Sequence, residues 1–179
     1  MRIQTIPLLE NPGLMLRPVE LADADAWYSY LAMPHAIEHT SWNVKSSADL
    51  GLLIGKYNLD EPASPIRFAI VERATNGLIG TIGFHTISPV NHTAEIAYDL
   101  HPTYWGRGIA TMCCKSVVQW GFADCTFVRV QATALDTNQA SARVLTKCGF
   151  ALEGKLRNYR IVRGEPRDFW MYSRIAKSI

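Results

Sequence analysis

The hydrophobic period of this sequence changes at a short glycine-rich run, and that change constrains the fold more than any other feature. Between Thr93 and Leu100, apolar residues stand at alternate positions, which is typical of a β-strand. After Gly108 they recur three and four residues apart, which is typical of a helix with one buried face. A β-branched run, residues 127–133, then predicts another strand. This order of strand, helix and strand predicts a parallel pair of strands joined by a helix.

The segments around this unit indicate antiparallel strands and shorter helices. The turn at Asn76-Gly77 tolerates positive φ and joins two strands into a hairpin, and a second hairpin turns near Gly164-Glu165-Pro166. Ser46 or Ser47 can cap one helix, and Asn138 can cap another. The expected strands are 14–19, 66–72, 78–87, 93–100, 127–133 and two after residue 149, and the expected helices are 20–32, 47–57, one starting at 108, and 138–147. This pattern predicts an α+β fold with a mixed sheet.

Length and composition favour one folded domain. The chain has 179 residues, 48% of them hydrophobic and 19% charged, and we expect residues 1–179 to form a single domain. The formal net charge is only +2, so no nucleic-acid partner is expected. We find no apolar stretch long enough to span a membrane and no apolar signal core at the start, so we expect no membrane partner and a cytoplasmic location, as a monomer or homodimer.

The four cysteines and five histidines show no metal-binding pattern. The cysteines lack the C-x-x-C spacing of zinc sites and are expected to be buried small residues; they are Cys113, Cys114, Cys125 and Cys148. The histidines lack the spacing of metal ligands, so no metal is expected; they are His35, His39, His85, His92 and His101.

The run from Leu100 to Thr111 has the features of an anion-binding site. A strand ends, a proline turn follows, and Gly106 and Gly108 precede a long helix. The first amides of a helix lack intrahelical acceptors and lie at the positive end of its dipole, and glycines let a phosphate approach the backbone. A Walker loop does not fit, because Ile109 follows the second glycine where that motif needs lysine. A dinucleotide fingerprint does not fit either, because Thr111 stands where it needs a third glycine or alanine.

Two motifs resemble the coenzyme-binding signatures of the GNAT acetyltransferase superfamily. The run from Trp105 to Ala110 resembles R/Q-x-x-G-x-G/A, with Trp105 in place of the arginine or glutamine. The run from Asn138 to Phe150 resembles the second coenzyme helix, N-x-x-S-x-x-V-L-x-K-x-G-F. The two motifs have the order and separation of the family, and the resemblance covers most of the chain from Leu14 onward. Within the superfamily the sequence is most similar to the ribosomal-protein N-terminal acetyltransferases of the RimJ/RimL type.

This resemblance implies a fold and a co-substrate. The implied fold is a mixed, mostly antiparallel sheet flanked by helices, whose central parallel strands splay apart so that the coenzyme lies between them. The implied acyl donor is acetyl-coenzyme A, and the acceptor is a primary amine. The residues that the resemblance assigns to coenzyme binding are Leu100, Trp105, Gly106, Arg107, Gly108, Ile109, Ala110, Thr111, Asn138 and Ser141.

The resemblance also implies two catalytic residues. Glu95 lies on the strand beside the acyl group and would act as general base, directly or through water; the other interpretation is a solvated carboxylate on a half-exposed strand. Ser141 matches the serine that RimL-like relatives place near the sulfur of the departing thiolate. Leu145 stands where many GNAT members have a tyrosine. Arg160 stands where the RimL type has a second candidate glutamate, which leaves the base open between Glu95 and water.

The acceptor side is less defined by the sequence. The resemblance implies that Trp27, Tyr28 and residues 33–42 border the acceptor amine, although core packing also explains Trp27. A set of arginines could form a basic rim or a solvated face; they are Arg157, Arg160, Arg163 and Arg167.

Direct attack by the amine is expected, because neither Cys113 nor Cys114 has an adjacent base that would activate it as a nucleophile. A protein N-terminal α-amine is the favoured acceptor. Small amines such as polyamines or aminoglycosides, and a coenzyme sensor without turnover, are the alternatives.

Overall fold

A single mixed sheet runs through the residues that the computed structural model describes, 5–38 and 40–177. The sheet has seven strands in the order β1-β2-β3-β4-β5-β7-β6. Neighbouring strands are antiparallel, except that β4 and β5 are parallel, as the sequence predicts. The strands are β1 (Leu14–Pro18), β2 (Ile66–Glu72), β3 (Leu78–Ser88), β4 (Thr93–Leu100), β5 (Arg129–Leu135), β6 (Ala151–Val162) and β7 (Glu165–Ile175).

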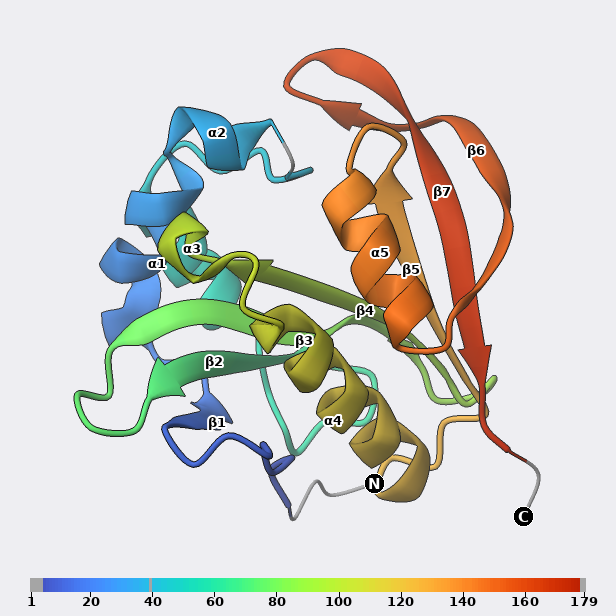
Figure 1. The fold of residues 1–179 in the computed structure, drawn as a ribbon, viewed down its shortest axis with the longest axis horizontal. Coiled ribbons are helices and arrows are strands. Elements are labelled where there is room, and N and C mark those ends of the chain that lie inside the picture. Colours follow the sequence, from blue (N-terminus) through green and yellow to red (C-terminus); the bar gives the residue numbers. More distant parts are fainter. Residues whose placement is uncertain (1–4, 39, 178–179) are drawn as a thin grey trace.

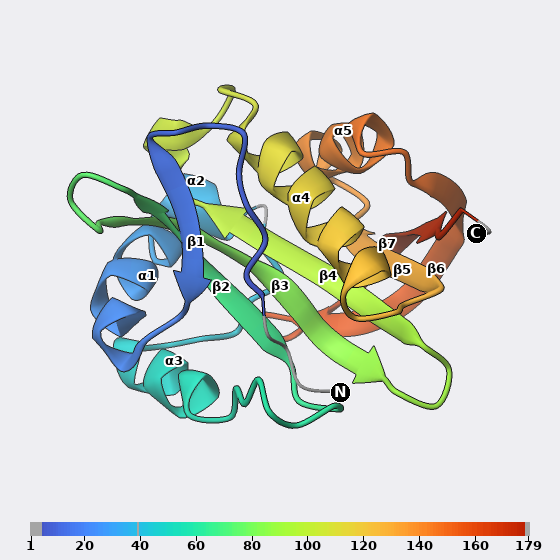
Figure 2. The same cartoon turned by 90° about the horizontal axis from the view of Figure 1, so that it is seen from below.

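Helices cover both faces of this sheet (Figures 1 and 2). The long α4 packs its apolar stripe against the strands, and α5 lies beside it. On the other face α1 and α3 pack together around a second apolar cluster. The helices are α1 (Ala24–Leu31), α2 (Pro34–Ile37), α3 (Ser47–Ile54), α4 (Ile109–Ala123) and α5 (Gln139–Lys147), with short 3-10 turns at Leu21–Asp23 and Pro102–Tyr104.

The parallel strands β4 and β5 separate after a short paired region. Their register joins Thr93 to Arg129, Ala94 to Val130 and Glu95 to Gln131. Beyond these pairs β4 continues to Leu100 and β5 to Leu135, and β5 keeps its pairing with β7 along its whole length. The splayed strand pair is therefore confirmed, and the gap opens directly after Glu95.

Some element boundaries differ from the prediction for local reasons. The expected helix at 20–32 begins as a 3-10 turn, because the Asp23 carboxylate accepts from the Glu20 backbone N–H at 2.8 Å and ties that turn down. The helix α3 ends at Ile54 instead of residue 57, although Ser46 caps its start as predicted. The segment 33–42 contains α2, which starts with proline at its first turn. The four cysteines are buried, as expected.

Candidate active site

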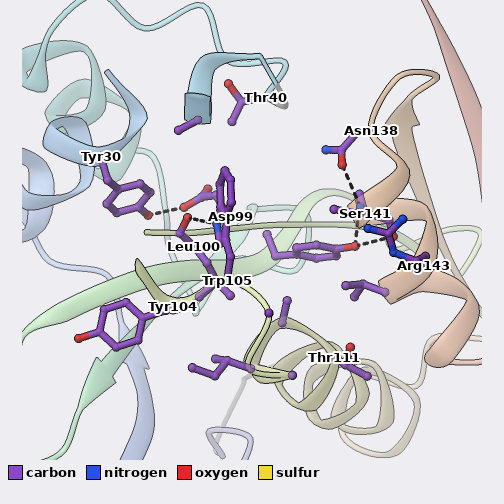
Figure 3. Close-up of a pocket in the computed structure, with 18 of the residues that line it drawn as sticks. Tyr30, Thr40, Asp99, Leu100, Tyr104, Trp105, Thr111, Asn138, Ser141 and Arg143 are labelled. Atoms are coloured by element: carbon purple, nitrogen blue, oxygen red, sulfur yellow. Dashed lines mark hydrogen bonds between the residues drawn. The ribbon is translucent and has the colours of Figure 1, made fainter. Parts of the chain in front are cut away.

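Two cavities meet at the gap between β4 and β5. The first has a volume of about 360 Å³ and lies between the loop before α4, the start of α4, and α5 (Figure 3). The second has a volume of about 290 Å³ and is bordered by Trp42, Leu53 and Tyr57 from the side of α1 and α3. Both cavities are lined by Thr40, Tyr98, Asn138 and Ser141. A molecule in one cavity can therefore meet a molecule in the other at this gap.

The loop that precedes α4 has the backbone of an anion cradle. Gly106 has φ 74° and Gly108 has φ 76°, in the left-handed region that favours glycine. A Cβ built on either residue would meet no other heavy atom within 4 Å. The helix begins at Ile109 without a hydrogen bond from a capping side chain. Its first N–H groups thus border the first cavity, where they can bind an anion.

Nine of the ten residues predicted to bind coenzyme line this first cavity. They are Leu100, Trp105, Gly106, Gly108, Ile109, Ala110, Thr111, Asn138 and Ser141. The tenth, Arg107, lies outside the lining, because its guanidinium sits over the ring of Tyr104 at 5.3 Å. The role of Arg107 in coenzyme binding stays a prediction.

Two cations that the sequence analysis missed face the same cavity. Arg143 and Lys147 lie four residues apart on α5 and both line it, with Arg143 opposite Trp105 in Figure 3. Residues four apart share one face of a helix. This spacing, on the same helix as Asn138 and Ser141, was the signal that could have identified them.

Trp105 fastens the loop to the end of β4. Its indole N–H donates to the Leu100 carbonyl oxygen at 2.8 Å, and its ring makes an edge contact with His35 at 6.0 Å. The residue that replaces the family's usual arginine or glutamine thus holds the turn by a backbone contact.

Ser141 is held in place where the two cavities meet. Its backbone N–H donates to Asn138 Oδ1 at 2.9 Å, which confirms Asn138 as the cap of α5. Its Oγ lies 2.9 Å from the hydroxyl of Tyr98 on β4. Burial raises the pKa of Tyr98, so its phenol stays protonated. The Ser141 hydroxyl therefore has a fixed, neutral hydrogen-bonding partner beside the gap.

Glu95 is buried and surrounded by donors. Its side chain accepts from Thr133 at 2.7 Å, Arg160 at 3.0 Å and Gln131 at 3.2 Å, and His85 Nε2 lies 3.1 Å from Oε1. Burial alone would raise the pKa of Glu95, but the hydrogen bonds and charge of His85, together with the hydrogen bonds of Thr133 and Gln131, outweigh it and lower the pKa to about 2. The residue is 5% exposed, so the interpretation as a solvated carboxylate is wrong. Its role as a base stays a prediction.

A second buried carboxylate fixes the neighbouring part of β4. Asp99 forms an ion pair with Arg67 at 2.6 Å and accepts from Thr81, from Tyr30 and, at 3.1 Å, from the indole of Trp27. Arg67 reaches across β3 and also donates to the Ala97 carbonyl oxygen at 2.9 Å. This network holds β4 at the gap.

The predicted acceptor residues divide into two groups. Trp27 is fully buried in the α1–α3 cluster, and Tyr28 bonds to the Lys45 carbonyl, so neither lines the second cavity. Within residues 33–42, Thr40, Ser41 and Trp42 do line it. Core packing is therefore the correct interpretation of Trp27.

Of the four predicted rim arginines, only Arg160 lines either cavity. Arg163 instead links the β6–β7 hairpin to Thr40, which lines both cavities, by donating to the Thr40 carbonyl oxygen at 3.0 Å.

The described residues contain no group of three His, Cys, Asp or Glu that could hold a metal ion, and His39 lies outside them. Burial raises the pKa of Cys113 to about 12, so that thiol is not an activated nucleophile. Among the described helices, none has the length and apolar character needed to cross a membrane.

Comparisons with known proteins agree with this geometry. The family model for the acetyltransferase (GNAT) domain matches residues 13–151. The chain is 34% identical to the uncharacterized N-acetyltransferase YoaA of Bacillus subtilis, over 93% of this chain and 96% of the relative. It is 32% identical to the uncharacterized N-acetyltransferase p20 of Bacillus licheniformis, over 94% and 96%.

A solved structure is also similar. It is RimL, the ribosomal L7/L12 alpha-N-protein acetyltransferase, in complex with coenzyme A, with a TM-score of 0.80 and 22% identity over 95% of this chain and 98% of that one. The splayed strands, the glycine loop and the family match agree, and the chain belongs to the GNAT family of acetyl-coenzyme A-dependent N-acetyltransferases.

Proposed function

We propose that this enzyme acetylates a protein N-terminal α-amine by direct attack of the amine on acetyl-coenzyme A within a ternary complex. The observation that carries the proposal is the pair of cavities that share Tyr98, Asn138 and Ser141 at the strand gap. One cavity has the features of a coenzyme site, and the other is open to an acceptor. We infer that the enzyme works in the cytoplasm, as a monomer or homodimer.

The first cavity fits the coenzyme by its chemistry. The left-handed glycines leave open space above the backbone, and the uncapped start of α4 offers N–H donors to the pyrophosphate. Arg143 and Lys147 add positive charge from α5. When bound there, the coenzyme supplies an activated acetyl thioester, and the residues of this chain orient it.

The second cavity favours an amine without extra positive charges. Among the described residues that line it, none is Asp or Glu, whereas Arg67, His85 and Arg160 are basic. The nearby carboxylates of Glu95 and Asp99 are already bound by several donors each. A polyamine would therefore find no carboxylate to hold its second ammonium group.

An α-amine also suits the reaction chemically. Its ordinary pKa is about 7.7–8.0, against about 10.4 for a lysine-type amine, so a much larger fraction is neutral near pH 7. The name of RimL describes the same kind of acceptor for that protein. Both points support a protein N-terminus over a polyamine.

Glu95 and Ser141 belong to opposite halves of the proposed reaction. Glu95 contacts His85 and Arg160, which line the second cavity, where the amine loses its proton. Ser141 lies at the gap, where its hydroxyl can donate to the departing thiolate. Burial raises the pKa of the Cys113 thiol, and a hydrogen bond with Cys148 together with burial raises that of Cys114, so neither is an activated nucleophile, which supports direct transfer over an acyl-enzyme.

The test is release of coenzyme A on a panel of acceptors, followed by mass spectrometry to place the acetyl group. We expect turnover with peptides that have free α-amines and none with the same peptides blocked at the N-terminus. Faster turnover with spermidine or an aminoglycoside than with the peptides would show that the acceptor is a small amine and overturn the proposed protein substrate. Tight acetyl-coenzyme A binding without release on any acceptor would identify a sensor and overturn the proposal.

A further inference from the structure

We infer that His85 accepts the proton that the acceptor amine loses, and that Glu95 holds the His85 imidazole in position for this step. The inference rests on the proposed function and assigns a further catalytic residue to it. From the sequence, His85 is one of five histidines without the spacing of metal ligands, and no other role is predicted for it.

A bulge in β3 places this imidazole. The β3–β4 register pairs Phe84 with Ile96 and then Thr86 with Glu95, so His85 is an extra residue without a cross-strand partner. Bulges of this kind redirect side chains and are frequent beside active sites. Here His85 and Thr86 both stand opposite the single residue Glu95.

The substrate would meet His85 before it meets Glu95. His85 lines the second cavity and its side chain is 32% exposed. Glu95 lines neither cavity, and its side chain is only 6% exposed behind Thr133 and Arg160. The imidazole is thus the accessible member of the pair.

The hydrogen bonds select the ring nitrogen that can act. Nε2 lies 3.1 Å from Glu95 Oε1, and Nδ1 lies 3.0 Å from the Thr86 hydroxyl. A neutral imidazole that donates from Nε2 to the carboxylate keeps its lone pair on Nδ1. Because the Thr86 hydroxyl lies at this lone pair and is exposed, it can pass the proton on: it gives its own proton to Nδ1 and takes one from the amine, directly or through a water.

Glu95 is suited to support an imidazolium and poorly suited to take the proton itself. Its carboxylate already accepts from three side chains besides its contact with His85, and its low pKa makes it a weak base. A fixed negative charge 3.1 Å from Nε2 stabilises the protonated ring. The other charged side chains among the described residues that line the second cavity are Arg160 on β6, bound to Glu95, and Arg67 on β2, bound to Asp99.

The proposed step balances in protons and electrons. The ammonium group of the acceptor gives one proton to His85 Nδ1, and the amine lone pair then attacks the thioester carbonyl carbon. The carbon–sulfur bond breaks with its electron pair on sulfur. The thiolate takes a proton from the Ser141 hydroxyl, and the second proton of the attached nitrogen passes through water to reprotonate Ser141. The imidazolium returns its proton to solvent, so one proton is released for each ammonium group that is acetylated.

The test uses His85→Gln and a matched control, His92→Asn. His92 lies in the β3–β4 turn at φ 51°, which asparagine tolerates, and it lines neither cavity. We expect His85→Gln to lower kcat/KM for a peptide acceptor by roughly 100-fold with unchanged acetyl-coenzyme A affinity by calorimetry. His92→Asn is expected to match the wild type. Unchanged affinity also shows that His85→Gln is folded.

Two further readouts separate proton transfer from a structural role. Added imidazole is expected to restore activity to His85→Ala, because a free base can enter the space of the missing ring. Glu95→Gln is expected to move the ascending limb of the pH–rate profile to lower pH, because the imidazolium loses its counter-charge. The inference is overturned if His85→Gln keeps the wild-type kcat/KM at every pH of the profile, or if imidazole does not restore His85→Ala. In both cases acetyl transfer by the wild-type enzyme still stands. No transfer by the wild-type enzyme to any amine overturns the proposed function instead.

Discussion

Tyr98 Oη lies 2.9 Å from Ser141 Oγ, and this contact joins β4 to α5 where the two cavities meet. The Ser141 backbone is held separately by Asn138, so its hydroxyl can be removed without loss of the helix cap. Substitution of Ser141 therefore tests protonation of the departing thiolate without disturbing the cap of α5.

Ser141→Ala is expected to lower kcat by roughly 100-fold with little change in coenzyme affinity, because the departing thiolate loses its proton donor. An acetyl thioester of a more acidic thiol needs less help to leave, so the deficit should shrink with such a donor. Tyr98→Phe, which removes only the partner of Ser141, should give a smaller deficit of the same kind. Steady-state kinetics with both donors measure this, and an equal deficit for both donors would contradict the role of Ser141.

The buried Arg67–Asp99 pair should matter for stability more than an exposed pair does. Asp99→Ala leaves Arg67 charged and buried without its partner, and we expect it to lower the free energy of unfolding by about 3–5 kcal/mol. The control is Glu153→Ala, which breaks an ion pair with Arg129 whose side chains are 26% and 40% exposed. That loss should stay below about 1 kcal/mol. Urea unfolding of both variants measures the difference, and similar losses would show that the buried network is not important to the fold.

The lowered pKa of Glu95 predicts a loss of stability in acid. Because its pKa is about 2 in the folded protein against an ordinary value of 4.5, the ionised group stabilises the fold above pH 4.5, and this contribution declines as the pH falls toward 2. The shift corresponds to about 3 kcal/mol at neutral pH. Glu95→Gln lacks this titration, so its stability deficit relative to the wild type should shrink as the pH falls.

Urea unfolding between neutral pH and about pH 3 measures this convergence. Other low-pKa carboxylates such as Glu153 are present in both proteins and cancel in the comparison. A deficit that stays constant with pH would show that Glu95 is not held by its donors in the way described.

The sequence predicts the strands better than the contacts between them. The strands β2 and β4 begin and end at the predicted residues, because their apolar patterns are bounded by turn signals. The glycine loop and the cap at Asn138 are also local, and nine of the ten residues predicted to bind coenzyme line the first cavity. Local sequence patterns therefore predict most of the residues that line the first cavity.

The acceptor side depends on register and on long-range pairs, which local patterns do not contain. The bulge that turns His85 toward Glu95 has no signal in either strand alone. Arg67 and Asp99 meet across β3 and lie 32 residues apart in the chain. Trp27 was assigned to the acceptor side by resemblance, whereas its burial comes from the packing of α1 on α3.

The most direct test of the account is a calorimetric titration of acetyl-coenzyme A into the wild type, Gly108→Trp and Gly164→Trp. Both glycines have positive φ and open space around a built Cβ, but only Gly108 borders the coenzyme cavity. We expect saturable binding by the wild type and Gly164→Trp, and a Kd at least about tenfold weaker for Gly108→Trp. No saturable heat with the folded wild type, or equal affinities for the two variants, would contradict the claim that this loop holds the coenzyme.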